Sequence, residues 1–381
     1  MLAVTAMARR RRRLGTVVEI GALAVLAYLP ATFLAGLLPF HAWGTALFWL
    51  FVVAVAVAIG GGSWLLGQRG LVDPLLATLG ATVGLLTVDI LAGGPLQLNT
   101  VFGYTPTVAG RFAGLGNPAF SMLAAASILL ATLLAYRVGG RRGVWAGIAV
   151  LVGAVVLDGM PFWGADVGGV LSLVPAAGVT AWFLLGYRVR LRTAVLLVGS
   201  AVAVVAVFGL LDLARAPERR THLGRLFADI GSNGFEAFET VVLRKLDANL
   251  SVLTSSIWTL MLPVVIAFVA YLFWRAPSRL RRIQEAIPQE RAAVAGLIAA
   301  MVLGFALNDS GIAVPGMMLG VTNAALVHLV IRVGAETGWS GGSAGATASS
   351  GSAPSGDGSA GPTDGDERAP GATGPMAGRS V

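Results

Sequence analysis

The sequence predicts an all-α, polytopic integral membrane protein, a helical bundle with about ten transmembrane helices. Apolar residues make up 56% of the 381 positions and charged residues only 12%, whereas soluble domains carry roughly 25% charged residues. The apolar residues gather in long runs, and short arginine clusters separate these runs. A helix needs about 20 residues to cross a hydrocarbon core of roughly 30 Å. The lipid bilayer is therefore the predicted environment of most of the chain.

Ten runs come close to the required length, and we expect each to form one membrane helix. They lie at residues 16–38, 44–66, 74–93, 117–136, 143–163, 167–186, 193–212, 255–274, 292–308 and 312–331. The first run follows a basic segment, residues 1–15. It is long for a signal peptide, and no small-residue cleavage site follows it. We therefore interpret it as the first transmembrane helix.

The arginine distribution predicts that both termini lie in the cytoplasm. With the N-terminus inside, the cytoplasmic segments up to Arg332 hold eighteen basic residues and the outer segments hold seven. This asymmetry follows the rule that short cytoplasmic loops are enriched in Lys and Arg. Six of the seven outer basic residues lie in one long loop, where the rule carries less weight.

Two segments are predicted to lie outside the bilayer. The extracytoplasmic loop 213–254 separates helices one to seven, within 16–212, from helices eight to ten, within 255–334. The tail 335–381 is rich in Gly, Ser, Ala, Pro and Thr. Because the tail has few bulky apolar residues to offset its conformational entropy, we expect it to be disordered and cytoplasmic.

Composition and missing motifs exclude several functions. The chain has no cysteine, so disulfides, thiolate metal sites and cysteine nucleophiles are impossible. Its net charge is +8, but the basic residues sit between apolar runs, which is a topology signal and not the sign of a nucleic-acid partner. Gly114-Leu115-Gly116 has no third glycine after it and no predicted strand before it, so the string does not predict a dinucleotide-binding site. A Walker A loop and HExxH are also missing.

The outer loop before the fourth helix carries a candidate anion site. This loop reads GGPLQLNTVFGYTPTVAGRFAGLGNP and holds one cation, Arg111. Asn117 is a favoured N-cap residue and Pro118 a favoured first helical residue, so the fourth helix should begin here. A helix N-terminus beside an arginine can bind an anion. The alternative is an ordinary glycine-rich loop.

Four carboxylates at the outer ends of helices form a second candidate site. Asp158 and Asp166 flank the short connection DGMPFWGAD, and the ninth helix ends at Asn308-Asp309. Asp89 lies near the outer end of the third helix. A carboxylate at membrane depth costs several kcal/mol unless it is hydrated or paired. We expect these residues to share one hydrated recess; the alternative is that each is a separate interfacial cap or a partner of an outer arginine.

The long outer loop has two parts. The first carries a basic cluster made of Arg219, Arg220, His222 and Arg225, which could hold a phosphate or diphosphate. His222 would then act as acid or base, because its ordinary pKa permits both roles near neutrality. The alternative is attraction to lipid headgroups. The second part predicts an amphipathic helix on the membrane surface, with an apolar stripe made of Phe235, Phe238, Val242, Leu246, Leu250 and Leu253.

The string from Arg111 to Pro118, RFAGLGNP, resembles the R-x-x-G-x-x-N-P signature of the O-antigen ligase and polymerase family. The later order of two helices, a small polar motif and a large outer loop with a histidine is also similar. That family carries Ser-Arg-Gly where this chain has Ala165-Asp166-Val167. The resemblance implies transfer of a glycan linked to a lipid diphosphate. It implies that Arg111 binds the diphosphate and that His222 activates the acceptor hydroxyl. The resemblance also implies that three loop arginines assist: Arg219, Arg220 and Arg225.

The set GRFAGLGN, PFWGADVGG, RRTHLGR, RKLDANL and NDSGI also resembles a family of actinobacterial polytopic membrane proteins. The low lysine content fits that origin. This second resemblance implies the same membrane location and brings no activity with it.

Three functional hypotheses remain. The first is an outward-facing enzyme or binding protein for an anionic, lipid-linked cell-envelope glycan, with His222, Asp158 and Asp166 as catalytic residues and no cofactor. A variant has a divalent cation held by the aspartates. The second is a transporter or flippase that uses the recessed carboxylates. The third is a non-catalytic scaffold for envelope assembly. The inner halves of the predicted helices offer few polar residues, which favours a one-sided site over a transport path.

Overall fold

The computed structural model describes residues 2–98, 100–104, 114–188, 190–233, 277–308 and 310–336, with a few isolated positions between 251 and 274. Within these ranges the secondary structure is helical, and the sole pairing of extended backbone is an isolated bridge between Leu98 and Tyr104. The all-α fold class is therefore confirmed.

Nine helices in the described part are long and apolar enough to cross a membrane. Their bounds are α1 Leu2–Ala35, of which Leu14–Ala35 is the candidate span, α3 Thr45–Leu66, α4 Asp73–Leu91, α6 Asn117–Val138, α7 Gly140–Gly159, α8 Val167–Leu184, α9 Leu191–Leu213, α14 Glu290–Leu307 and α15 Ala313–Glu336. They confirm nine of the ten predicted spans, and the protein is a multi-pass membrane protein. The tenth predicted span, 255–274, lies outside the described residues, as does nearly all of the tail.

Shorter helices connect or flank the spans. They are α2 Phe40–Trp43, η1 Pro95–Gln97, η2 Pro217–Arg219, α10 His222–Asn233 and α13 Pro277–Ala286. The basic cluster of the long loop therefore continues directly into a helix, α10, which the sequence did not predict. The predicted apolar stripe that begins at Phe235 lies outside the described residues.

The predicted fifth span ends earlier than expected. We predicted 143–163, whereas α7 runs from Gly140 to Gly159 and gives way to a tight turn. Pro161 explains the difference, because a proline disfavours the helical conformation in the residue before it. Met160 accordingly has φ −62° and ψ 128°, which is extended backbone.

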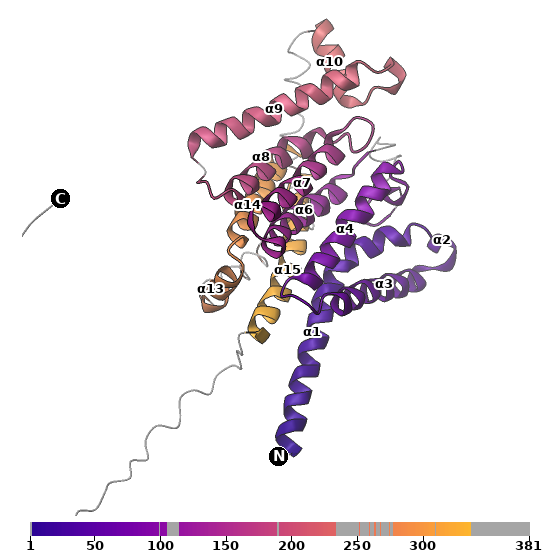
Figure 1. Cartoon of the computed structure of the whole chain (residues 1–381). Coiled ribbons are helices and arrows are strands. Elements are labelled where there is room, and N and C mark those ends of the chain that lie inside the picture. The colour runs from indigo at the N-terminus through magenta and orange to yellow at the C-terminus, as the bar shows by residue number, and fades with distance from the viewer. Residues whose placement is uncertain are drawn as a thin grey trace, which may run out of the picture. The chain divides into compact units, whose positions relative to one another are not determined.

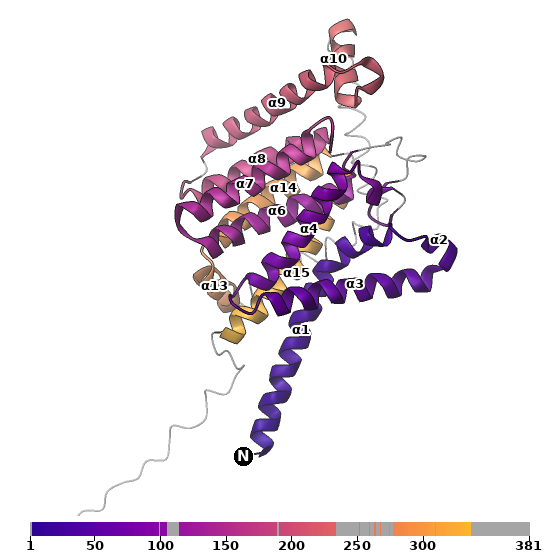
Figure 2. The ribbon, with the colours of Figure 1, turned by 45° about the vertical axis from the view of Figure 1, so that its right-hand side comes forward.

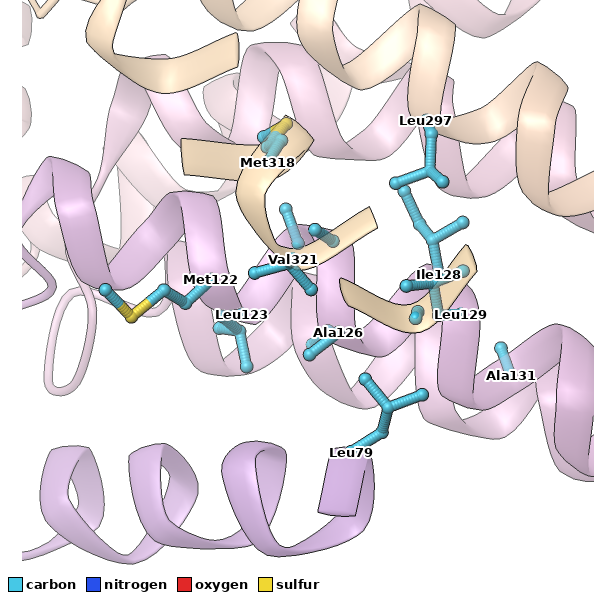
Figure 3. Packing of buried hydrophobic residues seen from close by; sticks show 14 of the residues in the cluster. Leu79, Met122, Leu123, Ala126, Ile128, Leu129, Ala131, Leu297, Met318 and Val321 are labelled. Atoms are coloured by element: carbon cyan, nitrogen blue, oxygen red, sulfur yellow. The ribbon is translucent and has the colours of Figure 1, made fainter. Parts of the chain in front are cut away.

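Helix α6 is the central element of the bundle (Figures 1 and 2), where it packs against α4, α7, α8, α14 and α15. Nearly every side chain along it is buried, and many are alanine or serine. Figure 3 shows the apolar packing around it, with Met122, Leu123 and Ile128 of α6 among residues of α4, α14 and α15. In a bilayer such contacts act through close van der Waals packing, since lipid tails are as apolar as the side chains.

The connected helices give the bundle two distinct ends. We call one the motif end; there α4, α7, α9 and α14 finish and α6, α8 and α15 begin. The opposite arginine end is held by ion pairs such as Arg137 of α6 with Asp73 of α4. By the arginine distribution, the motif end is the predicted outer side.

Small residues set the contact between α6 and α7, which supports a direct test. A Cβ atom on Gly147 would lie 2.5 Å from the backbone oxygen of Ala131, whereas one on Gly153 meets nothing within 4 Å. We expect Gly147→Leu to lower the free energy of unfolding by about 1–3 kcal/mol, because overpacking forces the two helices apart. Reversible unfolding in detergent measures this difference, with Gly153→Leu as the matched control. Equal stability of the two variants would contradict the packing described.

Candidate functional site

The turn between α7 and α8 carries the two aspartates of the predicted site. Asp158 lies in the last turn of α7, and its backbone oxygen accepts a hydrogen bond from the Asp166 N–H at 3.0 Å. The Gly164 N–H bonds to the Leu157 oxygen at 3.0 Å, which closes the turn. Asp166 precedes α8, yet its carboxylate forms no capping hydrogen bond to the helix. Asp166 thus occupies the N-cap position of α8 without a side-chain capping hydrogen bond.

The side chains of both aspartates are buried and face the same glycine. Asp158 is 0% exposed and Asp166 is 4% exposed. A Cβ atom on Gly169 would lie 2.5 Å from Oδ2 of Asp158, 2.7 Å from Oδ2 of Asp166 and 2.8 Å from the Phe120 ring. Any side chain at position 169 would thus collide with both carboxylates. Gly169 makes room for this carboxylate pair, and sequence reasoning missed it because glycine is common in membrane helices.

Two predicted asparagines join the same end of the bundle. Asn308 is fully buried where α14 ends, and its Nδ2 would lie 3.6 Å from a Cβ atom on Gly168. Its Oδ1 accepts the Ser310 N–H at 3.1 Å, and Asn117 Nδ2 donates to the Ser310 hydroxyl at 2.6 Å. The starts of α6, α8 and α15 therefore meet the end of α14 beside the carboxylate pair.

The predicted N-cap role of Asn117 is wrong by one position. Gly116 is the N-cap of α6, and Asn117 is its first residue. The amide of Asn117 is engaged by Ser310 of a distant segment, which local sequence cannot reveal. Arg111 and Asp309, which were also predicted at this end, lie outside the described residues.

Asp89 has a structural role in the loop that follows α4. Its Oδ1 accepts the Leu96 N–H at 2.7 Å, and its Oδ2 accepts from Nε2 of Gln97 at 3.0 Å. Gln97 in turn accepts the Gly116 N–H at 2.8 Å through Oε1. Asp89 thus folds the loop after α4 and fixes the start of α6. Among the described residues, no three His, Cys, Asp or Glu side chains come close enough together to hold a metal ion.

The loop before α6 approaches the turn before α8 closely. The Leu115 N–H donates to the Gly164 oxygen at 2.7 Å. Gly114 has φ +95°, and a Cβ atom there would lie 2.4 Å from the same oxygen. The glycines of the GLG string therefore have a packing reason, since only glycine adopts this conformation in so little space.

Asp212 at the end of α9 organises the segment that carries the predicted basic cluster. It is fully buried and accepts four hydrogen bonds: from the Thr221 N–H at 2.9 Å, the Thr221 hydroxyl at 2.6 Å, the Gly224 N–H at 2.8 Å and Nη1 of Arg215 at 3.0 Å. Arg215 also donates to the Pro161 oxygen at 2.9 Å and lies 4.9 Å over the Phe162 ring. Asp212 and Arg215 thereby tie this segment to the turn between α7 and α8.

The basic cluster itself lies on the surface of that segment. Arg219, His222 and Arg225 are exposed. Arg220 is half-buried, and its Nε donates to the Arg215 oxygen at 3.0 Å. The cluster is held near the turn that carries the aspartates, but the structure separates exposed basic groups from buried carboxylates. The residues that hold it, Asp212 and Arg215, were missed; a carboxylate ending an apolar helix, followed by an arginine three residues later, is the signal that could have found them.

An apolar groove lies between α7, α8 and α9. It encloses about 550 Å³ with α8 as its floor, and α7 and α9 contribute its walls. Its lining includes Leu151, Val155, Ala177, Gly178, Leu197, Ala203 and Phe208. At the motif end the Phe208 ring lies against Gly159, the residue after Asp158. The groove lining therefore reaches the residue that follows Asp158 in the chain, although neither aspartate lines the groove.

A larger cavity, of about 870 Å³, lies between α1, α2, α3 and residues 98–101. None of the predicted site residues lines it, and its titratable lining residue is the exposed His41. Volume alone therefore does not select the functional site, and the chemistry favours the motif-end cluster.

The fold and the cluster define a multi-pass, all-α membrane protein with polar residues buried at one end of its bundle. No protein-family profile, no curated protein and no solved structure matches the chain. The two family resemblances drawn from its motifs stay hypotheses.

The role assigned to Asp212 can be tested by proteolysis. We expect Asp212→Ala to increase the rate of tryptic cleavage after Arg219, Arg220 and Arg225 at least about tenfold. Removing a carboxylate that accepts several hydrogen bonds costs about 1.5–3 kcal/mol and opens the segment locally. Glu218→Ala, an exposed carboxylate in the same segment, is the control and should cleave at the parental rate. Unchanged cleavage of Asp212→Ala would show that other contacts hold the segment.

Proposed function

We propose that this protein binds an anionic, lipid-linked glycan at the motif end and transfers the glycan to an acceptor on the predicted outer side of the membrane. The observation that carries the proposal is the buried carboxylate pair, Asp158 and Asp166, whose neighbour Gly159 packs against Phe208 of the apolar groove. An amphiphilic substrate needs a hydrocarbon site, a polar site and a site for its phosphates in that order. Three adjacent features of this end meet those needs.

The groove supports the lipid part of the proposal. A volume of about 550 Å³ falls within the roughly 300–1,000 Å³ of ordinary ligand pockets. Its walls are aliphatic and lie along membrane-spanning helices, so a hydrocarbon chain is the chemistry that fits them. A chain in the groove would place its headgroup beside Gly159 and the carboxylate pair.

The basic segment supports the diphosphate part. Arg219 and Arg225 are exposed and free to reach an anionic headgroup, and Arg215 fixes the segment beside the turn. Arginine suits phosphate because its planar guanidinium donates two parallel hydrogen bonds. In the transfer step these cations would stabilise the negative charge that develops on the leaving diphosphate.

The chemistry requires one proton acceptor. Asp158 takes the proton of the acceptor hydroxyl while the hydroxyl oxygen bonds to the anomeric carbon of the glycan. The bond from that carbon to the diphosphate oxygen breaks, and its electron pair leaves with the lipid diphosphate. In this proposal Asn117 and Asn308 orient sugar hydroxyls of the glycan.

A carrier is the second candidate function, and one observation favours it. The sequence offered few polar residues toward the opposite end, whereas the structure places Glu19, His328 and Arg332 together there, inside the bundle. Polar groups at both ends are what a transport path requires. In a carrier the carboxylate pair would bind a proton or a cationic substrate.

Binding of a polyprenyl-diphosphate oligosaccharide to the protein in nanodiscs tests the proposal. We expect Ala203→Trp, which fills the groove, to weaken binding at least about tenfold, because about 1.4 kcal/mol of hydrocarbon contact corresponds to that factor. Val202→Trp places the same side chain on the exposed, lipid-facing side of α9 and should bind like the parent.

Asp158→Asn separates binding from chemistry in the same assay. We expect it to keep binding within about threefold and to lose release of the free lipid diphosphate by about a hundredfold or more, as for loss of a general base. Parental protein that neither binds nor consumes the lipid-linked glycan would discard the proposal. Uptake of a solute into proteoliposomes that Asp158→Asn abolishes would instead support the carrier.

A further inference from the structure

A buried polar cluster joins three helices toward the arginine end. Glu19 of α1 is 9% exposed, and it accepts hydrogen bonds from Nε1 of Trp64 at 3.0 Å and from Nη1 of Arg332 at 3.1 Å. Nη2 of Arg332 also donates to the backbone oxygens of Gly67 and Gly70, each at 3.2 Å. These bonds tie α1 and α15 to the turn between α3 and α4.

His328 lies within this cluster, one helical turn before Arg332 on the same face of α15. It is 0% exposed, and neither ring nitrogen has a hydrogen-bond partner among the residues that the structure describes. The backbone of Glu19 also lies close to the ring. The charges of Glu19 and Arg332 are both close enough to act on the imidazole.

A purely structural role does not account for this histidine. A buried polar group without a partner costs about 1–3 kcal/mol, and an apolar residue would fill the same space without that cost. Such groups in folded proteins call for an explanation, for which a functional role is one candidate. The imidazole beside a carboxylate has the chemistry of a proton acceptor.

We infer that His328 and Glu19 form a proton-binding site toward the arginine end of the bundle. A proton adds to the unprotonated ring nitrogen, and the imidazolium then has Glu19 as its counter-charge. Arg332 keeps its bonds to the Gly67 and Gly70 oxygens, so the Glu19 carboxylate can turn from Arg332 toward His328. Proton binding therefore redistributes the ion pair that joins α1 to α15.

The charged groups around the imidazole are few. Glu19 comes from α1 and Arg332 from α15 itself, and these are the two whose charges act on His328. The other helices packed against α15 also carry charged residues toward this end: Arg137, Arg281, Arg282, Glu285, Glu290 and Arg291. The inference concerns a site distinct from the motif end and does not depend on the proposed glycan chemistry.

Nitrogen NMR of the imidazoles tests the inference. The chain has three histidines, so histidine-labelled protein in nanodiscs gives three pairs of ring signals, which single substitutions to glutamine at His41, His222 and His328 assign. We expect the His328 signals to change from neutral to imidazolium as the pH falls from about 8 to about 4. In Glu19→Gln the titration midpoint of His328 should move to a lower pH by about half a pH unit or more. The imidazolium fraction at the low-pH end should therefore be smaller than in the parental protein.

Glu285→Gln, an exposed carboxylate on α13, is the matched control and should leave the His328 titration unchanged. A His328 ring that stays neutral over the whole range would overturn the inference, as would a titration that Glu19→Gln does not alter. The titration of the parental protein needs no substitution at Glu19. A His328 ring that stays neutral in the parental protein would therefore overturn the inference even if Glu19→Gln fails to fold.

Discussion

The approach of two carboxylates at Gly169 is the constraint on which the motif end depends. Asp158 and Asp166 come from the end of one membrane helix and the start of the next, and the turn between them is closed by backbone bonds to Leu157 and Asp158. Gly168 and Gly169 admit Asn308 and the carboxylates where larger residues would exclude them. The breaking of the helix at Pro161 is what allows this arrangement, since a helix continued to residue 163 would carry Asp166 away from Asp158.

The bilayer explains why polar groups gather at the two ends of the helices and the middle is apolar. Unpaired polar groups in hydrocarbon cost several kcal/mol each. Around the centre of α6 the packing is aliphatic (Figure 3), and the buried hydroxyls Thr78, Thr82 and Thr132 bond to carbonyls of their own helices. Charged side chains are found where neighbouring helices supply partners, as at Asp212 and Glu19.

Most of the fold could be predicted from the sequence because bilayer thickness fixes the length of an apolar run. The gathering of Asn117, Asp158, Asp166 and Asn308 was also predictable, since all four stand at helix ends on one predicted side. The individual hydrogen bonds of these residues could not be predicted from the sequence. Asn117 meets Ser310 and Glu19 meets Arg332 across separations of 193 and 313 residues, which only tertiary packing decides. Asp89 was grouped with the site because sequence cannot show that Leu96 and Gln97 occupy its oxygens.

Photocrosslinking most directly tests whether the groove between α7, α8 and α9 holds the lipid chain of the proposed substrate. The probe is a polyprenyl-diphosphate glycan with a diazirine in its hydrocarbon chain, and the labelled peptides are identified by mass spectrometry. The account predicts labels concentrated on the groove faces of α8 and α9, around Ala177 and Ala203, that excess unlabelled glycan lipid removes. Labels spread over lipid-facing helices, or concentrated at the cavity between α1 and α3, would contradict it.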